Sequence, residues 1–164
     1  MAYPLLQKYQ FKAVIFIPTA FIGKEILYDD NPTFYMSVEQ LKAMDTSLIQ
    51  FGLHSHLHNN FGEIAIDEIE KDLDTCLDIF NNHKIPFLPL LAYPFGARPK
   101  DEAVLRQMKE LFKRKGIKVA FRIGNKVNPF SPTDFYELKR IGISGNDSFM
   151  SFRAKLKKGR IKLF

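Results

Sequence analysis

The sequence has no tryptophan and only one cysteine among its 164 residues. The single cysteine, Cys76, cannot form a disulfide within the chain, which excludes a disulfide framework. A zinc site built from several cysteine thiolates is excluded for the same reason. Any metal held by this chain must therefore be bound by histidine, aspartate or glutamate side chains.

A long hydrophobic run is also missing. The longest apolar stretch, residues 85–95, contains Pro86, Pro89 and Pro94 and is shorter than the roughly 20 residues that a membrane-spanning helix requires. The first residues lack the basic region and the apolar core of a secretory signal. We therefore expect no transmembrane segment, and the sequence alone gives no localisation.

Positive charge is concentrated at the C-terminal end. The chain carries 24 Lys and Arg against 18 Asp and Glu, a formal net charge of +6. Residues 150–164 hold six cations and no acid, so the rest of the chain is balanced. The six are Arg153, Lys155, Lys157, Lys158, Arg160 and Lys162. Because charge runs are usually solvated, we predict a solvated basic helix and tail, with an anionic phospholipid surface as the alternative and no nucleic-acid partner.

Composition and length together indicate one folded domain. With 46% hydrophobic and 13% aromatic residues, the chain can bury a substantial core. Its length suits one domain of ordinary size and is too short for two. We therefore predict a single domain over residues 1–164.

Apolar runs of strand length alternate with segments of helical spacing, a pattern typical of βα units around a parallel sheet. The pattern predicts five strands and four helices. Five strands are too few to close an eight-stranded barrel, so we expect either an incomplete barrel or an open sheet. The expected strands are residues 11–18, 49–54, 87–93, 117–123 and 137–143. The expected helices are residues 37–48, 66–81 and 101–115 and a terminal helix from about Ser148.

Three of the four histidines, His54, His56 and His58, lie within five residues. They follow a predicted strand, and sites in parallel α/β folds are built at the C-terminal ends of strands. In an extended segment all three rings would share a face, whereas a tight turn would pair His54 with His58 and direct His56 elsewhere. Because neutral imidazole is the commonest metal ligand, the cluster predicts a divalent metal site; the alternative is a histidine-rich surface turn.

A second feature is a turn that follows the third predicted strand. Residues 91–96 read Leu-Ala-Tyr-Pro-Phe-Gly. Proline fixes the backbone and glycine permits an unusual conformation, so such a turn can hold the N–H of Phe95 rigidly toward a ligand. Without other observations it remains only a turn.

Five segments, taken in order, resemble the polysaccharide deacetylase family, also called the NodB-homology family or carbohydrate esterase family 4. The family's histidine motif, H-[ST]-x-x-H, matches His54, Ser55 and His58. The resemblance covers most of the chain and implies a distorted, here incomplete, (β/α)7 barrel. The segments are Tyr3-Pro-Leu-Leu-Gln-Lys-Tyr, Phe11-Lys-Ala-Val-Ile-Phe-Ile-Pro, Met36-Ser-Val-Glu-Gln-Leu, Gly52-Leu-His-Ser-His-Leu-His and Ala92-Tyr-Pro-Phe-Gly.

The resemblance implies a metal-dependent hydrolase that removes acetyl groups from a polysaccharide. It makes His54 and His58 the ligands of a divalent ion, with zinc expected, and places Ser55 and His56 beside them. A metal-bound water would attack the acetyl carbonyl after an aspartate takes its proton, and a histidine would protonate the leaving amine.

The resemblance also assigns the turn and the substrate. The backbone N–H of Phe95, in a turn with Tyr93 and Pro94, is implied to stabilise the oxyanion of the tetrahedral intermediate. The implied substrate is an acetylated polysaccharide or oligosaccharide such as an N-acetylglucosamine polymer or peptidoglycan, which suggests an envelope or periplasmic setting. Tyr93 and Phe95 either stack on sugar rings or pack in the core.

Parts of the family pattern are absent. The motif T-F-D-D-G, which supplies the base and the third metal ligand in the family, does not occur. Asp29 and Asp30 are adjacent but lack its flanking residues, so we interpret them as loop residues. No histidine follows His83, and Ala92 stands where many members have arginine. We therefore expect a chain that begins after the first βα unit and lacks both proton-transfer groups.

Three hypotheses remain open at this point. The chain is a deacetylase with weak or no activity by itself, a non-catalytic glycan-binding member of the family, or a hydrolase of small amides on the same scaffold. An open barrel exposes apolar surface and unpaired strand edges, which also predicts self-association.

Overall fold

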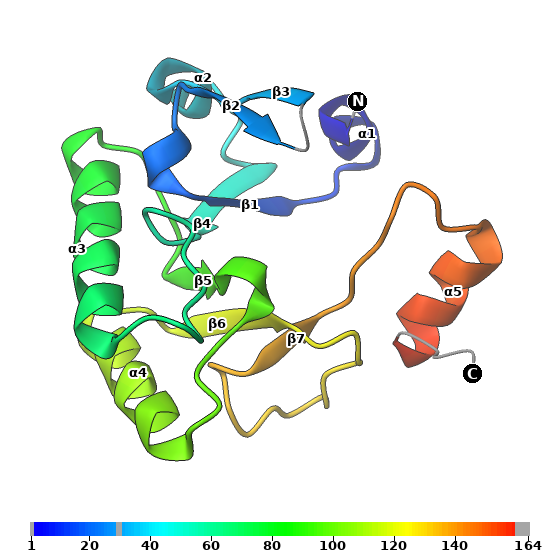
Figure 1. Cartoon of the computed structure of the whole chain (residues 1–164). Coiled ribbons are helices and arrows are strands. Elements are labelled where there is room, and N and C mark those ends of the chain that lie inside the picture. The colour runs from blue at the N-terminus through cyan, green and yellow to red at the C-terminus, as the bar shows by residue number, and fades with distance from the viewer. Residues whose placement is uncertain (1, 29–30, 160–164) are drawn as a thin grey trace.

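Five parallel strands form the central sheet of the computed structural model, which describes residues 2–28 and 31–159 (Figure 1). The strand order places β1 and β7 at the two edges, so the described part of the sheet is open. The prediction of an α/β fold with an incomplete parallel sheet is confirmed. In their order across the sheet the strands are β1 (Ala13–Ile17), β4 (Ile49–Leu53), β5 (Leu90–Ala92), β6 (Val119–Ile123) and β7 (Leu138–Arg140).

The remaining elements surround this sheet. Helices α3 (Ile66–Asn82) and α4 (Glu102–Arg114) lie along the same side of it, whereas α5 (Phe149–Lys158) stands away from it (Figure 1). An antiparallel hairpin, β2 (Glu25–Tyr28) and β3 (Asn31–Phe34), forms a separate two-stranded sheet. The other helical elements are α1 (Ala2–Tyr9), η1 (Thr19–Phe21), α2 (Val38–Lys42) and η2 (Pro94–Gly96).

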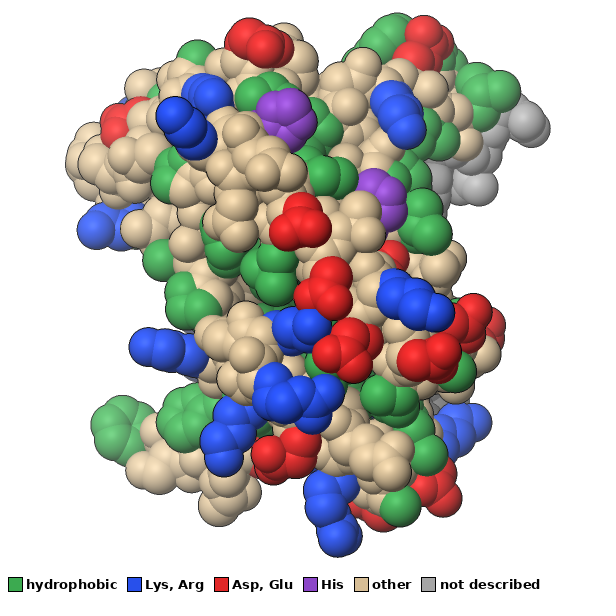
Figure 2. All heavy atoms as spheres, turned by 90° about the vertical axis from the view of Figure 1, so that its left-hand side faces the viewer, with side chains coloured by type: hydrophobic (Ala, Val, Ile, Leu, Met, Phe, Trp, Pro, Cys, Tyr) green, Lys and Arg blue, Asp and Glu red, His purple; other side chains and the backbone are tan. Residues whose placement is uncertain are grey.

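The core lies between the sheet and the two long helices. The apolar positions of α3 recur every three or four residues, and Ile69, Leu73, Cys76 and Phe80 are fully buried, which confirms the interpretation of Cys76 as a core residue. The outer side of α3 and α4 is charged instead, with cations and acids interspersed (Figure 2). Ion pairs such as Arg114–Glu70 join the two helices there.

Helix α2 begins where the sequence predicts and ends earlier. Ser37 and Gln40 form the expected capping box, with each side chain accepting a hydrogen bond from the other's backbone N–H at 3.3 and 2.8 Å. The carboxylate of Asp45 accepts bonds from the amide and hydroxyl of Ser47 at 2.9 and 2.6 Å, and this turn competes with helix. The prediction of a helix through residue 48 is therefore wrong in its last residues.

Strand β5 is shorter than the predicted 87–93. Proline has no N–H to donate, so Pro86 and Pro89 interrupt the ladder before Leu90. The amide of Leu88 still donates to the carbonyl of Phe51 at 2.8 Å, which keeps this segment beside β4.

Some predictions fall on parts of the chain outside the described ranges. Asp29, Asp30, Arg160 and Lys162 lie there, so the interpretation of the two acids as loop residues and the end of the basic tail stay predictions. Ser148 caps α5 by accepting a hydrogen bond from the amide of Ser151, as expected for a helix that starts after it. Within the described ranges, no helix combines the length and apolarity needed to cross a membrane.

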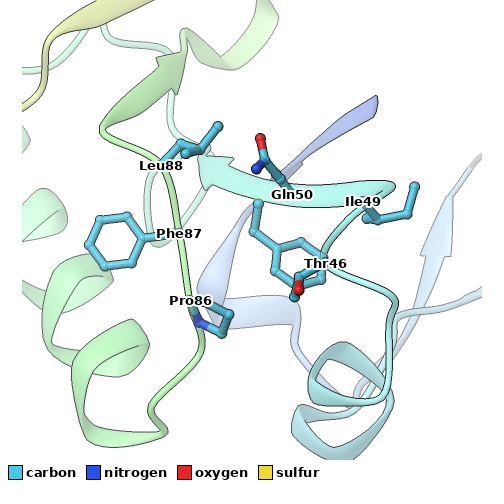
Figure 3. A pocket seen from close by; sticks show the side chains of 7 residues that line it. Thr46, Ile49, Gln50, Pro86, Phe87 and Leu88 are labelled. Carbon is cyan, nitrogen blue, oxygen red and sulfur yellow. The ribbon is translucent and has the colours of Figure 1, made fainter. Parts of the chain in front are cut away.

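One hollow lies at the N-terminal end of β4, between this strand and the segment that precedes β5 (Figure 3). No titratable side chain lines it, so it offers no group for acid–base or metal chemistry. Its lining consists of Thr46, Ile49, Gln50, Phe51, Pro86, Phe87 and Leu88.

Candidate active site

The loop after β4 brings two of the three clustered histidines together. Strand β4 ends at Leu53, and positive φ angles at Ser55 (65°) and His58 (61°) turn the chain back on itself. The Nε2 atoms of His54 and His58 consequently lie 3.2 Å apart, with ring centroids separated by 4.7 Å. Of the two arrangements that the spacing allows, the structure has the tight turn.

His56, in contrast, points away from this pair. Its Nδ1 lies 2.9 Å from the hydroxyl oxygen of Thr19, and its carbonyl accepts a hydrogen bond from the amide of Ala20 at 3.0 Å. Both partners belong to η1, the turn that follows β1. His56 therefore connects the histidine loop to its neighbour and does not face the other two rings.

The hydrogen bonds of His54 determine which of its nitrogens is free. Its Nδ1 donates to the carbonyl oxygen of Ala92 at 2.6 Å, because a carbonyl can only accept. In the neutral ring, Nε2 therefore carries the lone pair and faces His58. Burial lowers the pKa of His54 to about 4, with smaller contributions from the charges of His58 and Arg140. Burial also lowers the pKa of His58, so both rings are held toward the neutral form that binds metals.

Two side chains hold the backbone of the histidine loop. Ser55 is fully buried, and its hydroxyl accepts a hydrogen bond from the amide of His58 at 2.8 Å. Asp72, on α3, accepts hydrogen bonds from the amides of His56 and Leu57 at 2.7 and 2.8 Å. No motif marks Asp72 in the sequence, although an acid between Ile69 and Cys76 on the predicted buried face of a helix is a usable indication of a special role.

The second predicted feature, the turn after β5, lies beside this histidine pair. Pro94 is buried, whereas the ring of Phe95 is 63% exposed and its centroid lies 4.6 Å from that of His58. Phe95 has a φ of 55°, and the amides of Gly96 and Ala97 donate the turn's own hydrogen bonds. Within the described residues the amide of Phe95 has no such acceptor, so it can donate to a ligand.

Tyr93 belongs to the core. It is fully buried, its hydroxyl donates to the carbonyl of Tyr136 at 3.0 Å, and burial raises its pKa. Of the two aromatic residues in the turn, only Phe95 is exposed to solvent.

Arg140, at the end of β7, approaches the site from the far edge of the sheet. The guanidinium carbon lies 5.8 Å from the ring centroid of Phe16, which in turn lies 6.5 Å from that of His54. Burial lowers the pKa of Arg140, and its positive charge contributes to the low pKa of His54. Arg140 was not predicted as a site residue, because no local pattern in the sequence links positions 54 and 140.

The histidine pair fits part of a zinc site. Two nitrogens that each bind a tetrahedral zinc at about 2.0–2.1 Å are separated by about 3.3 Å, close to the 3.2 Å between the two Nε2 atoms. A catalytic zinc usually has three protein ligands. Within residues 2–28 and 31–159, no third His, Cys, Asp or Glu side chain joins the pair. The described residues therefore offer two ligands.

Fold and site together define an α/β protein whose candidate site lies at the C-terminal ends of parallel strands, where such folds place their chemistry. A family model described as polysaccharide deacetylase matches residues 1–121. The chain therefore belongs to the polysaccharide deacetylase family, as the sequence resemblance predicted.

Known relatives agree with this assignment. The chain is 29% identical over 157 residues to a poly-β-1,6-N-acetyl-D-glucosamine N-deacetylase of Staphylococcus aureus (strain MSSA476), an alignment that covers 90% of this chain and 50% of the relative. The same figures hold for the protein of that name from strain N315. The chain thus spans about half the length of the curated relatives it matches.

Solved structures show the same fold. A Streptococcus pyogenes deacetylase, PplD in complex with acetate, matches with a TM-score of 0.72 and 20% identity over 98% of this chain and 64% of that one. IcaB from Ammonifex degensii matches with a TM-score of 0.68 and 19% identity over 88% of this chain and 62% of that one. At such identities the likeness supports the predicted barrel-type fold and no more.

Proposed function

We propose that this chain carries part of the active site of a metal-dependent N-deacetylase that acts on an acetylated polysaccharide. The observation that carries the proposal is the pair of imidazole nitrogens, 3.2 Å apart, beside the turn that contains Phe95. Family membership gives the class of reaction, hydrolysis of a carbon–nitrogen bond other than a peptide bond. Its relatives named for poly-β-1,6-N-acetyl-D-glucosamine favour a polymer of β-linked N-acetylglucosamine as substrate.

His54 and His58 are the proposed ligands of a divalent ion, with zinc as the expected metal. When bound, such an ion supplies a water of lowered pKa and polarises the acetyl carbonyl. Burial keeps the His54 ring neutral near neutral pH, and the hydrogen bond to Ala92 places its one proton on Nδ1, so Nε2 is left to face the ion. Ser55 supports His58 through its backbone amide.

The turn after β5 supplies the proposed oxyanion donor. The amide of Phe95 is free to donate, and the buried Pro94 fixes its direction. A backbone N–H held in place needs no reorganisation when the carbonyl oxygen becomes negative in the tetrahedral intermediate. The exposed ring of Phe95 forms a surface next to His58 on which the sugar bearing the acetyl group can lie.

The alternative is a glycan-binding protein without catalysis. This alternative is favoured by the absence, among the described residues, of a carboxylate that completes the group formed by the two histidines. Among the described residues no proton acceptor then stands next to the proposed water, so we propose that turnover by this chain alone is weak or absent.

We also propose that the chain associates with itself. Strands β1 and β7 are edge strands of the described sheet, and several large apolar side chains are exposed, among them Leu27 (70%) and Phe34 (74%) on the hairpin.

Zinc stoichiometry and acetate release from β-linked N-acetylglucosamine oligomers test the proposal. We expect one zinc per chain with slow or no acetate release, and we expect the double variant His54→Gln and His58→Gln to lose the zinc and any acetate release. Zinc binding without acetate release supports the metal site and agrees with turnover that is weak or absent. Oligomer binding without zinc or acetate release would overturn the deacetylase proposal in favour of the glycan-binding alternative.

A further inference from the structure

Helix α3 carries one buried acid on its otherwise apolar inner face. Asp72 is only 7% exposed, and its neighbours along that face are Ile69, Leu73 and Cys76, which are fully buried. Burying a carboxylate is unfavourable unless strong hydrogen bonds compensate for the lost water. A buried acid at this position therefore needs partners, and the histidine loop supplies them.

The two carboxylate oxygens accept from two consecutive backbone amides. Oδ1 lies 2.7 Å from the nitrogen of His56, and Oδ2 lies 2.8 Å from that of Leu57. Hydrogen bonds of this kind, from a neutral donor to a charged acceptor, are among the stronger ones in proteins. Asparagine has the same shape but only one acceptor oxygen. In Asp72→Asn the side-chain NH2 would therefore face one of the two backbone N–H groups, and two donors cannot form a hydrogen bond.

The amides that Asp72 holds lie between the two proposed ligands in the sequence. On their N-terminal side, the carbonyl of Ser55 accepts from the amide of Thr19 at 3.2 Å, and on their C-terminal side the amide of His58 donates to Ser55. Ser55 and His58 both have positive φ angles, which residues other than glycine adopt only when the surroundings impose them. Asp72 is thus positioned to impose the turn that brings the imidazole rings of His54 and His58 together edge to face.

We infer that Asp72 is a positioning residue for the metal site: its carboxylate holds the amides of His56 and Leu57 and thereby sets the separation of His54 and His58. The inference rests on the proposed function in so far as it needs a cation at the two rings. The hydrogen bonds themselves do not depend on that cation.

Titration with Co²⁺, followed by its visible absorption, compares the wild-type chain with Asp72→Asn. Because changes behind metal ligands typically weaken binding by about 10–100-fold, we expect Asp72→Asn to bind Co²⁺ roughly tenfold more weakly and with an altered spectrum. Asp78→Asn, the same change at an exposed position of α3, is the matched control and should leave affinity and spectrum unchanged.

A second control separates positioning from general loss of stability. Ile117→Val removes one methylene group from a side chain that is 2% exposed and lies before β6, at the opposite end of the sheet from the histidines. It should lower thermal stability without changing Co²⁺ affinity. Amide hydrogen exchange at His56 and Leu57, measured without metal, should accelerate at least tenfold in Asp72→Asn only.

Wild-type affinity and spectrum in Asp72→Asn, or an equal loss in Ile117→Val, would overturn the inference. If the wild-type chain binds no Co²⁺, the proposed metal site is wrong. The exchange rates at His56 and Leu57 then decide whether Asp72 holds the loop, and unchanged rates in Asp72→Asn would contradict that role as well.

Discussion

Two features of the His54 environment shift its pKa in opposite directions. Its hydrogen bond to Ala92 favours the protonated ring, yet burial dominates and lowers the pKa to about 4. The effect of burial on the pKa of His54 is therefore larger than the effect of the hydrogen bond. The same environment that prepares Nε2 for a cation makes the folded chain sensitive to acid.

Stability should consequently fall below neutral pH. An unfolded chain protonates His54 with a pKa near 6.5 and the folded chain only near 4, so between these values the unfolded state binds more protons. The stabilising contribution is complete above about pH 6.5 and declines as the pH falls toward 4, by up to about 3 kcal/mol. Urea unfolding with a chelator present, at pH 7 and at pH 4.5, measures this change.

His54→Asn is the informative variant for this prediction. The asparagine amide can still donate to the carbonyl of Ala92 but does not titrate, so the decline between pH 7 and pH 4.5 should become shallower. An equally steep decline in His54→Asn would assign the acid sensitivity to other groups.

Phe95 should contribute to substrate use and not to metal binding. Its exposed ring contacts His58, whereas the proposed donor is its backbone amide. Phe95→Ala keeps that amide and removes a stacking surface worth about 0.5–1.5 kcal/mol, so kcat/KM for acetate release should fall roughly two- to thirteenfold. Zinc stoichiometry should stay at the wild-type value. Loss of zinc in Phe95→Ala would show instead that the ring supports His58.

The sequence predicts those site residues that lie close together along the chain. His54 and His58 stand out because they are clustered, and the turn at Pro94 because proline and glycine mark it. Asp72 and Arg140 reach the same place only through folding, from a helix face and from the far edge of the sheet. Spacing alone carries no information about such long-range neighbours.

The turn η2 depends on its glycine. Gly96 has a φ of 67°, and a Cβ atom there would lie 2.5 Å from the nitrogen of Ile123 on β6. That atom is backbone and cannot rotate away. The turn can therefore hold Phe95 beside the histidines only with glycine next to it.

Two glycine-to-alanine substitutions distinguish the cost of a positive φ angle from the cost of a steric clash of the new Cβ atom. Gly116 also has a positive φ, 76°, but a Cβ there meets nothing within 4 Å. Gly116→Ala should cost about 1 kcal/mol from backbone conformation alone. Gly96→Ala adds the collision with β6 and should cost about 2 kcal/mol or more, measured by urea unfolding. Equal decreases in the free energy of unfolding of the two variants would show that the backbone around Gly96 moves enough to avoid the clash with β6.

Element boundaries follow local chemistry that periodicity does not detect. The capping box at Ser37 correctly predicts the start of α2, whereas the turn at Asp45 ends this helix early. The hairpin of β2 and β3 was not predicted, because Pro32 lies within its second strand and proline argues against strand. Long amphipathic helices such as α3 are predicted best, since their apolar face is repeated over several turns.

At the scale of the whole molecule, the open sheet predicts concentration-dependent association. Leu27 and Phe34 are exposed on the same hairpin, and contact between copies would remove this apolar surface from water. Light scattering should show a mass above 19.0 kDa that rises with concentration. The double variant Leu27→Ser and Phe34→Ser should shift this equilibrium toward monomer, and a wild-type chain that stays monomeric at all concentrations would contradict the proposal.

The thiol of Cys76 can report the separation of α3 from the sheet. It is the only thiol, it is fully buried on α3, and burial raises its pKa to about 12. In disulfide exchange the Cys76 thiolate attacks a sulfur of the reagent and expels the reagent's other half as a thiolate, so labelling requires that α3 first separates from the sheet. The rate of that labelling, followed with increasing urea, reports the opening free energy of the helix that carries Asp72, with no dye or engineered cysteine added.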